Sequence, residues 1–548
     1  MGRAVALNRE QLTLGVALWF VAFGNIHFWS ALWRAAGGWH TGNGFFLATL
    51  PVFLLAWIYL TLSLLSWGRA TKPVLALLVI AAAFAEYFIR TYGVLIDHAM
   101  IANVMETHAA EAEELLNARL VLWVLLFGAL PALLVWRARV KTLPWSRQLK
   151  LKALGMAGAA LALVVVVLAN YSHYASVLRN HRELRLVLVP SNLVSAVHGY
   201  VERRIGGPHL LQAIGKDATR AAANGNKPLL LVLVIGETAR AGNFSLNGYA
   251  RPTNVELARE KVLSFSDVRA CGTSTAVSLP CMFLLAGREH FTPALASRQE
   301  GLLDVLQRAG IAVRWRDNNS GCKGICDRVP HEDLSRGSVA GLCREGECYD
   351  GILLHGLQAD LDRQAGDAVI VLHMKGSHGP AYFRRYPEAY RVFTPACERA
   401  ELDRCSRDEI VNAYDNTLRY TDHVLSETIR LLRRNAQRFD AAMIYVSDHG
   451  ESLGENGIYL HGFPYALAPR EQLEVPMIVW LSDGLARDRS IDLACLEARR
   501  DAPLSHDYIF HSVLGLADVR TSIYRGDRDL FAPCRPHRDR LVHAELTR

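Results

Sequence analysis

No cysteine precedes Cys271, and nowhere does the sequence place two cysteines in the C-x-x-C spacing. Structural zinc sites regularly use that spacing, so they are the less favoured explanation of the ten cysteines that follow. An even count at short separations is typical of disulfides formed in an oxidising compartment, although spacing leaves the connectivity open. The close neighbours are Cys271 and Cys281, Cys322 and Cys326, Cys343 and Cys348, and Cys397 and Cys405, which leaves Cys495 and Cys534.

Internal repeats, low-complexity tracts and nucleic-acid-binding motifs are also missing from the 548 residues. The net charge of +7 is no argument for a nucleic-acid partner, and we expect none, because much of the excess lies in short loops between apolar stretches. A chain of this length exceeds one ordinary domain.

Five apolar stretches precede residue 173, and each is close to the ~20 residues that a helix needs to cross a bilayer. The first is too long for a signal peptide and has four comparable stretches behind it, which favours an uncleaved anchor. We therefore predict a five-helix transmembrane domain over residues 1–172. The stretches run from Gln11 to Trp33, Phe45 to Trp67, Pro73 to Ile96, Leu120 to Trp136 and Ala153 to Tyr171.

Charges in the connecting loops indicate the orientation of these spans. The second loop carries Arg69 and Lys72, the fourth has basic charges only, and the third, residues 97–119, is acidic. Basic loops stay in the cytoplasm, so we expect a cytoplasmic N-terminus and everything after the fifth span outside, cysteines included. The fourth loop holds Arg137, Arg139, Lys141, Arg147, Lys150 and Lys152, and the third holds Asp97, Glu106, Glu111, Glu113 and Glu114.

Residues 173–215 link the apolar region to a polar one. The part from Arg179 to Arg204 mixes arginines with apolar residues, and Pro190 interrupts it. We interpret it as a helical bridge lying along lipid headgroups. A solvated linker is the alternative, and the apolar run from Leu184 to Val189 disfavours it.

Residues 216–548 show an α/β pattern. Valine-rich runs such as Leu229–Ile235 are expected for strands buried on both faces of a parallel sheet, and helical segments such as Val411–Arg434 separate them. Polar residues follow three such runs: Glu237 follows Leu229–Ile235, His378 lies in the loop after Ala368–Leu372, and Asp448 and His449 follow Ala441–Val446. Ligands bind beyond the carboxyl ends of strands in such sheets, so we expect these side chains to converge.

Two carboxylates and an imidazole, from Glu237, Asp448 and His449, suit zinc and, less well, manganese. An Asp-His pair alone is usually a turn with a surface histidine, but the repeated strand-end placement favours a metal. The segment Cys271–Cys281 is rich in hydroxyl groups and resembles a bracketed turn that opens a helix. Such a hydroxyl is most often an N-cap, yet a helix N-terminus also receives phosphoryl groups well. A threonine bound to zinc would become a nucleophile without a histidine base.

Three further histidines are candidates for the same site: His373, His378 and His461. Any one of them could be a structural histidine, but His378 and His461 lie in glycine-containing loops, which favours an open site. They could bind a second metal, hold a phosphate or protonate a leaving oxygen. Asn319 and Lys323 could supply an amide and an ammonium group for a phosphate.

The residues just named resemble the lipid A phosphoethanolamine transferases, a family that includes the mobile colistin-resistance enzymes. The resemblance covers nearly the whole chain and implies a transmembrane domain followed by a sulfatase/alkaline-phosphatase-like catalytic domain with a central, mostly parallel sheet. Its most specific pieces are Gly236–Arg240, Cys271–Thr275 with Pro280–Cys281, Asn319–Lys323 and Ser447–Glu455.

Carried over position by position, the resemblance implies that Thr275 is the nucleophile. It implies one firmly bound zinc held by Glu237, Thr275, Asp448 and His449, and leaves a second zinc during turnover open. His378 and His461 would act on the transferred phosphate, with His373, Asn319 and Lys323 nearby.

In the acidic third loop the resemblance implies substrate contacts from Asn103, Thr107 and Glu111. An exposed acidic helix is the alternative interpretation of this loop.

The function implied is transfer of phosphoethanolamine from phosphatidylethanolamine to lipid A phosphates through a phosphoethanolamine-threonine intermediate. Diacylglycerol would be released, and polymyxin resistance would follow. The enzyme is expected in the bacterial inner membrane, as a monomer among membrane lipids, with its catalytic domain in the periplasm.

Four alternatives are weighed against this function. The acceptor could be a core-oligosaccharide sugar, since the motifs concern the donor. A phosphatase or sulfatase would share the fold but would need no membrane spans. A lipoteichoic-acid-type glycerophosphate polymerase matches the bracketed motifs less well. A non-catalytic membrane sensor would require a broken site, whereas every expected ligand is present.

Overall fold

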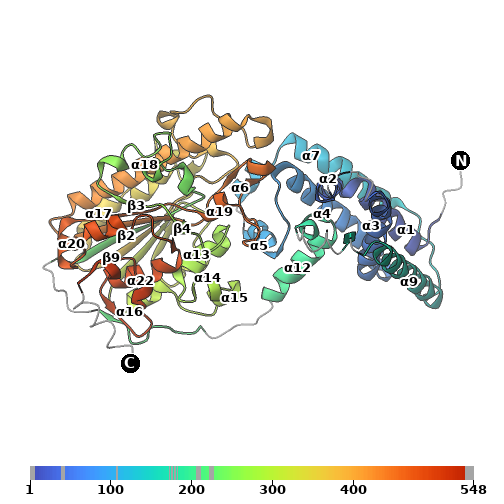
Figure 1. Cartoon of the computed structure of the whole chain (residues 1–548), viewed down its shortest axis with the longest axis horizontal. Helices are drawn as coiled ribbons and strands as arrows, with labels where there is room; N and C mark the ends of the chain where they lie inside the picture. Colours follow the sequence, from blue (N-terminus) through green and yellow to red (C-terminus); the bar gives the residue numbers. More distant parts are fainter. Residues whose placement is uncertain are drawn as a thin grey trace. The chain divides into compact units, whose positions relative to one another are not determined.

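The N-terminal apolar stretches fold as helices in the computed structural model of the chain (Figure 1). The structure describes residues 6–36, 38, 43–106, 109–171, 173–174, 177, 181, 183–204, 211–220 and 227–536. The chain divides into two compact units. A helical unit comprises Met1–Ala102 and Leu115–Val201, and a catalytic unit comprises Asn103–Glu114 and Glu202–Arg548.

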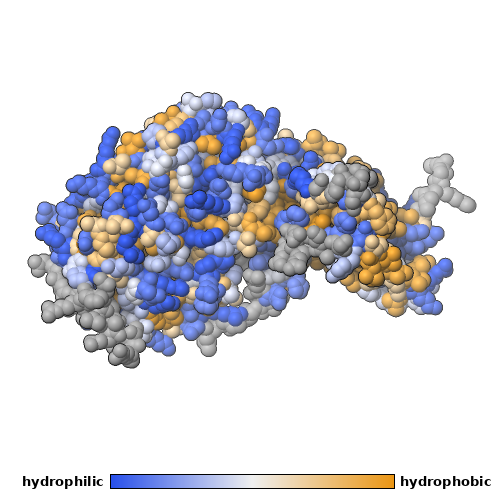
Figure 2. Space-filling view, viewed as in Figure 1, coloured by the Kyte–Doolittle hydropathy of each residue, from blue (hydrophilic) through white to orange (hydrophobic). Residues whose placement is uncertain are grey.

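Four helical stretches of the helical unit are long and apolar enough to cross a membrane. They match the second to fifth predicted spans. Large apolar side chains such as Leu154 and Leu168, each 69% exposed, cover the outside of these helices, as expected for surfaces that face lipid (Figure 2). The stretches are α3 (Gly44–Leu65), α4 (Thr71–Tyr92) with the turn before it, α7 (Ala118–Val124) continuing through a π-helical turn into α8 (Leu130–Arg137), and α9 (Trp145–Ala169).

The first predicted span is not one straight helix. It consists of α1 (Arg9–Trp19) with the π-helical turn Phe20–Gly24, and then α2 (Ile26–Ala35), with a bend of 64° between them. Asn25 causes the break, because its side chain replaces helical hydrogen bonds. Its amide group donates to the carbonyls of Phe20 at 3.1 Å and Val189 at 2.8 Å, and its oxygen accepts from the Val189 N–H at 2.9 Å.

Helix α9 begins at Trp145, eight residues before the predicted start of the fifth span. Lys152, which we had assigned to the basic fourth loop, is therefore a buried helix residue. Its ammonium group donates to the carbonyls of Ser63 and Ser66. The third loop folds as two short helices, α5 (His98–Glu106) and α6 (Ala109–Leu115), and Pro190 separates α11 (Leu184–Val187) from α12 (Ser191–Arg204).

A seven-stranded mixed sheet forms the centre of the catalytic unit, in the order β3-β13-β10-β2-β9-β5-β6. The block from β10 to β6 is parallel, whereas β13 runs antiparallel to both of its neighbours. The prediction of a mostly parallel sheet thus holds for the block that carries the predicted ligands. The strands are β2 (Leu229–Gly236), β3 (Leu263–Phe265), β5 (Ala312–Asp317), β6 (His331–Asp333), β9 (Ala368–His373), β10 (Asp440–Ser447) and β13 (Met477–Leu481).

Helices cover both faces of this sheet (Figure 1). Along β2, Leu231 and Leu233 belong to the core under α13 (Thr275–Phe283), α16 (Leu302–Arg308) and α22 (Asp507–Leu516). The alternate residues Val232 and Val234 belong to the opposite core, under α17 (Leu357–Arg363) and α18 (Arg407–Arg434). Burial on both faces explains why the strand is apolar throughout instead of alternating.

Smaller elements complete the catalytic unit. Two-stranded sheets pair β1 (Thr219–Arg220) with β15 (Val519–Arg520), β4 (Val268–Arg269) with β14 (Leu504–Ser505), β7 (Cys343–Arg344) with β8 (Glu347–Cys348), and β11 (Ser452–Leu453) with β12 (Tyr459–Leu460). The short helices are α14 (Gly287–His290), α15 (Pro293–Ala296), α19 (Arg470–Leu473), α20 (Asp483–Asp488) and α21 (Leu493–Ala498).

All ten cysteines are paired in five disulfides within the catalytic unit, as their spacing indicated. Each of the four close-neighbour pairs forms a bond, and the two remaining cysteines bond to each other. The bonds are Cys271–Cys281, Cys322–Cys326, Cys343–Cys348, Cys397–Cys405 and Cys495–Cys534.

Candidate active site

The carboxyl ends of four parallel strands bring the predicted ligands together. Gly236, the last residue of β2, pairs with Ser447 at the end of β10, so Glu237 and Asp448 leave neighbouring strands at one level. On the other side of β2, Ile235 pairs with His373 at the end of β9. His373 in turn pairs with Asp317, the last residue of β5. The expectation that these strand ends converge is confirmed.

Glu237, Asp448, His449 and Thr275 form a buried cluster at this edge. His449 Nε2 lies 3.2 Å from Glu237 Oε1 and 3.4 Å from Asp448 Oδ2. Thr275 Oγ1 lies 3.5 Å from the same nitrogen and donates a hydrogen bond to Glu237 Oε2 at 2.9 Å. Glu237, Asp448 and His449 are fully buried, and Thr275 is 8% exposed.

The electrostatics of the cluster show how strongly its charges interact. Burial and the charge of Glu237 together raise the pKa of Asp448 to about 7. Burial opposes a charge on His449, but Asp448 and Glu237 outweigh it and raise the pKa of His449 to about 10. Burial alone would raise the pKa of Glu237, yet the charge of His449 lowers it well below its usual value. Two carboxylates buried this close together repel each other, and a cation bound between them would relieve that repulsion.

The donor atoms fit a zinc ion. Zinc bonds oxygen and nitrogen ligands at about 2.0–2.2 Å, which sets the corners of a tetrahedron about 3.3–3.6 Å apart. The distances of 3.2, 3.4 and 3.5 Å from His449 Nε2 to the three oxygens match that spacing. The other ring nitrogen, Nδ1, faces the Gly450 carbonyl at 2.9 Å. A proton donated from Nδ1 to that carbonyl leaves the Nε2 lone pair for a metal.

Thr275 is the first residue of α13, at the positive end of that helix. The N-cap position belongs to Ser274, so Thr275 does not cap the helix and its hydroxyl is directed at Glu237. The turn before it is fixed by the Cys271–Cys281 disulfide and by the Gly272 N–H, which donates to the Ser278 hydroxyl at 2.8 Å. The turn that precedes Thr275 is therefore held in place by a covalent bond and a hydrogen bond.

His378 and His461 lie on the open side of the cluster. Together with Glu237 they form a second group of possible metal ligands. The His461 ring centre lies 4.4 Å from that of His449 and 5.5 Å from that of His378. Both histidines are thus close enough to act on a group bound at Thr275.

His373, by contrast, lies behind the cluster. It is fully buried, and its Nδ1 contacts Asp317 at 2.9 Å. Asn319 connects this pair to the cluster, because its amide group donates to Glu237 Oε2 at 2.7 Å and contacts His373 Nε2 at 3.3 Å. Asn319 therefore holds a metal-ligand candidate in place. The Lys323 ammonium group donates to the Ser320 carbonyl and hydroxyl, each at 3.1 Å.

Four residues of the site were missed as contributors by sequence reasoning. Asp317 orients His373, and the fully buried Glu451 accepts hydrogen bonds from His461 Nδ1 and the Tyr382 hydroxyl, each at 2.8 Å. His506 accepts from the Cys271 N–H at 3.1 Å. Thr238 has a left-handed φ of 54°, which is strained for a β-branched residue directly after a ligand candidate. Glu451 and Thr238 had a signal, since Glu451 follows Asp448 and His449 in one motif and Thr238 follows Glu237 in another.

The structure describes only some of the three residues predicted to contact substrate in the third loop. Asn103 lies in α5, Thr107 is outside the described residues, and Glu111 lies in α6, but its side chain is outside what the structure describes. Their substrate contacts remain a prediction.

We expect the Glu451→Gln substitution to lower turnover about 10- to 100-fold, the range seen when a group that orients a metal-site residue is removed. His461 and Tyr382 contact different oxygens of Glu451, and glutamine replaces one of these oxygens with an NH₂ group that cannot accept, so the paired arrangement that orients His461 is lost. Steady-state transfer assays with zinc analysis would measure this, with the surface variant Glu497→Gln as the control. Unchanged turnover would show that Glu451 does not orient His461.

The chain is similar to known proteins over nearly its whole length. The family model described as sulfatase matches residues 230–519, and the model described as phosphoethanolamine transferase EptA/EptB matches residues 54–205. Phosphoethanolamine transferase EptA of Escherichia coli K12 is 41% identical over 541 residues, which cover 96% of this chain and 98% of the relative. Phosphatidylethanolamine transferase Mcr-1 of Escherichia coli is 40% identical, covering 87% and 89%.

A solved structure agrees with these matches. The integral membrane protein lipooligosaccharide phosphoethanolamine transferase A (EptA) of Neisseria meningitidis superposes with a TM-score of 0.94 at 37% identity, covering 97% of this chain and 100% of that one. With the strand-end cluster in place on the same fold, the chain belongs to the EptA/EptB family of phosphoethanolamine transferases.

Proposed function

We propose that this enzyme transfers phosphoethanolamine from phosphatidylethanolamine to the phosphate groups of lipid A through a covalent intermediate on Thr275. The observation that carries the proposal is the buried cluster in which Thr275 Oγ1 lies 2.9 Å from Glu237 and 3.5 Å from His449. The names of two relatives agree with the donor and the acceptor class, since one is a phosphatidylethanolamine transferase and one acts on lipooligosaccharide.

Glu237, Asp448, His449 and Thr275 would hold one zinc ion, and Glu237, His378 and His461 could hold a second during turnover. Bound there, zinc would lower the pKa of the threonine hydroxyl and neutralise charge on the phosphoryl oxygens.

In the first half-reaction, Thr275 Oγ1 attacks the phosphorus of phosphatidylethanolamine and its proton passes toward Glu237 Oε2, to which it is already hydrogen-bonded. The bond from phosphorus to the diacylglycerol oxygen breaks, and His461 or His378 protonates the leaving oxygen. In the second half-reaction, the hydroxyl oxygen of a lipid A phosphate attacks the same phosphorus and gives its proton to that histidine, while the bond to Thr275 Oγ1 breaks and Oγ1 takes its proton back from Glu237. Asn319 keeps Glu237 in position through both steps.

The membrane setting follows from the substrates, because donor and acceptor are both lipids. We propose an inner-membrane protein with five spans, a cytoplasmic N-terminus and a periplasmic catalytic domain, with residues 173–215 along the headgroups. The basic loops support this orientation. So does Leu7, which pairs with Val140 of the basic fourth loop and thereby places the N-terminal end of α1 on the side of that loop. The four ligands come from one chain, so we propose a monomer.

Adding phosphoethanolamine to a lipid A phosphate attaches an ammonium group to an anionic site. The outer membrane then loses negative charge and attracts cationic polymyxins less. We expect lipid A from bacteria that express the chain to gain phosphoethanolamine, with reduced polymyxin susceptibility. Mass spectrometry of extracted lipid A, beside cells with an empty vector, measures the gain. Modification of core sugars alone would show that the acceptor is a core sugar and not lipid A. If the protein is folded and neither lipid A nor core sugars are modified, the proposed transfer is contradicted.

A further inference from the structure

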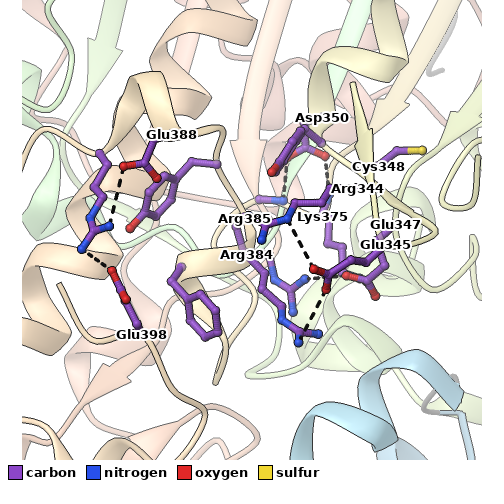
Figure 3. A pocket seen from close by; sticks show the side chains of 15 residues that line it. Arg344, Glu345, Glu347, Cys348, Asp350, Lys375, Arg384, Arg385, Glu388 and Glu398 are labelled. Atoms are coloured by element: carbon purple, nitrogen blue, oxygen red, sulfur yellow. Dashed lines mark hydrogen bonds and ion pairs between the residues drawn. The ribbon is translucent and has the colours of Figure 1, made fainter. Parts of the chain in front are cut away.

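A pocket of about 370 Å³ lies in the catalytic unit beside the loop that carries His378 (Figure 3). Charges of both signs line it, in contrast to the acid-rich metal cluster. Its charged residues are Arg344, Lys375, Arg384, Arg385 and Arg391 together with Glu345, Glu347, Asp350, Glu388 and Glu398.

Arg385 is the most connected of these residues. Its side chain is only 2% exposed, and each of its guanidinium nitrogens has a partner. Nε donates to the His378 carbonyl at 2.8 Å, and one terminal nitrogen donates to Glu347 at 3.2 Å. The other terminal nitrogen donates to both carboxylate oxygens of Glu114. Arg385 therefore joins the His378 loop to a residue 271 positions earlier in the chain.

Glu114 lies in α6, within the segment 103–114 that belongs to the catalytic unit. Its side chain is 2% exposed, whereas its neighbour Glu113 is exposed. A carboxylate is buried to this extent only when it is paired and hydrogen-bonded, and removal of one partner of a buried pair is costly. The pair thus fixes α6 at a residue whose neighbours Ala112 and Glu113 are exposed.

Further contacts connect Arg385 to the cluster of Glu237, Asp448, His449 and Thr275. Lys375 binds Glu347 at 2.9 Å, next to Arg385. Dashed lines in Figure 3 mark the contacts of both cations with that carboxylate. The charges of Lys375 and Arg385 outweigh burial and lower the pKa of Glu347, so it is ionised. Gly376 lies so close to the Glu237 backbone that a Cβ would meet the Glu237 carbonyl oxygen at 2.6 Å. One continuous loop therefore packs against Glu237 and contacts Arg385.

We propose that the Glu114–Arg385 pair is a positioning device for the lipid substrates: it holds helix α6 against the loop that carries His378, and the chemistry at Thr275 does not depend on it. The inference rests on the proposed function, because it concerns how lipids reach Thr275. It assigns Glu114 and Arg385 a role separate from the ligand cluster, since neither residue contacts Thr275 in the described part of the chain.

The Glu114→Gln variant of the full-length enzyme in mixed micelles tests this, with Glu113→Gln as the matched control one position away. Two rates are compared: loading of Thr275 from phosphatidylethanolamine, and loading of Thr275 from a water-soluble phosphoethanolamine ester. We expect kcat/KM with the lipid to fall on the order of 10²-fold, as misplacement of a substrate-positioning group can cost, and loading from the soluble ester to stay within about twofold. Glu114→Asp, which keeps the charge, should recover part of the loss.

A structural role alone would lower both rates together, because an unfolded or distorted cluster loads from neither donor. Equal loss of both rates, or no loss of either, would overturn the inference. Wild-type enzyme that loads from neither donor would instead contradict the proposed function, and the inference would fall with it. Wild-type loading together with a selective loss in Glu114→Gln supports both.

Discussion

The Thr275→Ala enzyme is expected to lose transfer by on the order of 10⁴-fold or more, since removal of a nucleophile leaves only binding and electrostatic contributions. Thr275 supplies the only hydroxyl that contacts both Glu237 and His449 among the described residues. The three other ligand candidates remain, so zinc binding should weaken without being abolished. Labelled phosphatidylethanolamine followed by intact-protein mass spectrometry would show no covalent adduct.

Thr275→Ser is the matched variant, because it keeps the hydroxyl and removes only a methyl group. We expect it to form the adduct and to retain measurable transfer. Adduct formation in Thr275→Ala would place the nucleophile elsewhere, and the neighbouring Thr273 and Ser274 would be examined next.

Asp448→Asn is expected to abolish tight zinc binding and, with it, transfer. Asparagine preserves the shape of the side chain but removes one of the two carboxylate charges that face His449, and zinc sites of this kind use charged oxygens. Metal analysis of the purified variant and the transfer assay measure the two effects. The exposed Asp527→Asn is the control for a lost carboxylate elsewhere in the catalytic unit.

The metal-free proteins separate this effect from misfolding. The pKa of Asp448, raised to about 7 from an ordinary value near 3.8, means that ionised Asp448 destabilises the metal-free fold. The metal-free fold therefore keeps its full stability at low pH, where Asp448 is protonated in both the folded and the unfolded protein, and loses part of it as the pH rises from about 3.8 toward 7. Asparagine mimics the protonated form, so metal-free Asp448→Asn should unfold at no lower temperature than metal-free wild type at pH 7.5. A lower unfolding temperature would contradict the assigned repulsion.

Much of the cluster of candidate ligands could be predicted because the ends of parallel strands, which lie far apart in the sequence, meet at one edge of the sheet. Glu237, Asp448 and His449 each follow a strand that is apolar on both faces, so local pattern and topology give the same answer. Disulfide formation could be predicted from the sequence as well, because most partners lie within ten positions of each other.

The parts that escaped prediction depend on single side-chain contacts. Asn25 interrupts a run whose hydropathy is continuous, since one amide group can replace backbone hydrogen bonds. Glu451 and Asp317 act through histidines that lie 10 and 56 positions away, and periodicity carries no information about such pairs. Glu114 was identified only as one acidic residue among several in its loop.

The two edge strands of the central sheet affect how well the enzyme resists aggregation at high local concentration. Both outermost strands, β3 and β6, are only three residues long, and β6 consists of His331, Glu332 and Asp333. Edges this short, of which β6 is also charged, offer a poor template for strand addition by a second chain. Proteins confined to a membrane meet repeatedly in two dimensions, where an open edge would promote aggregation. The catalytic unit is thus protected against this form of self-association by the same sheet that builds its site.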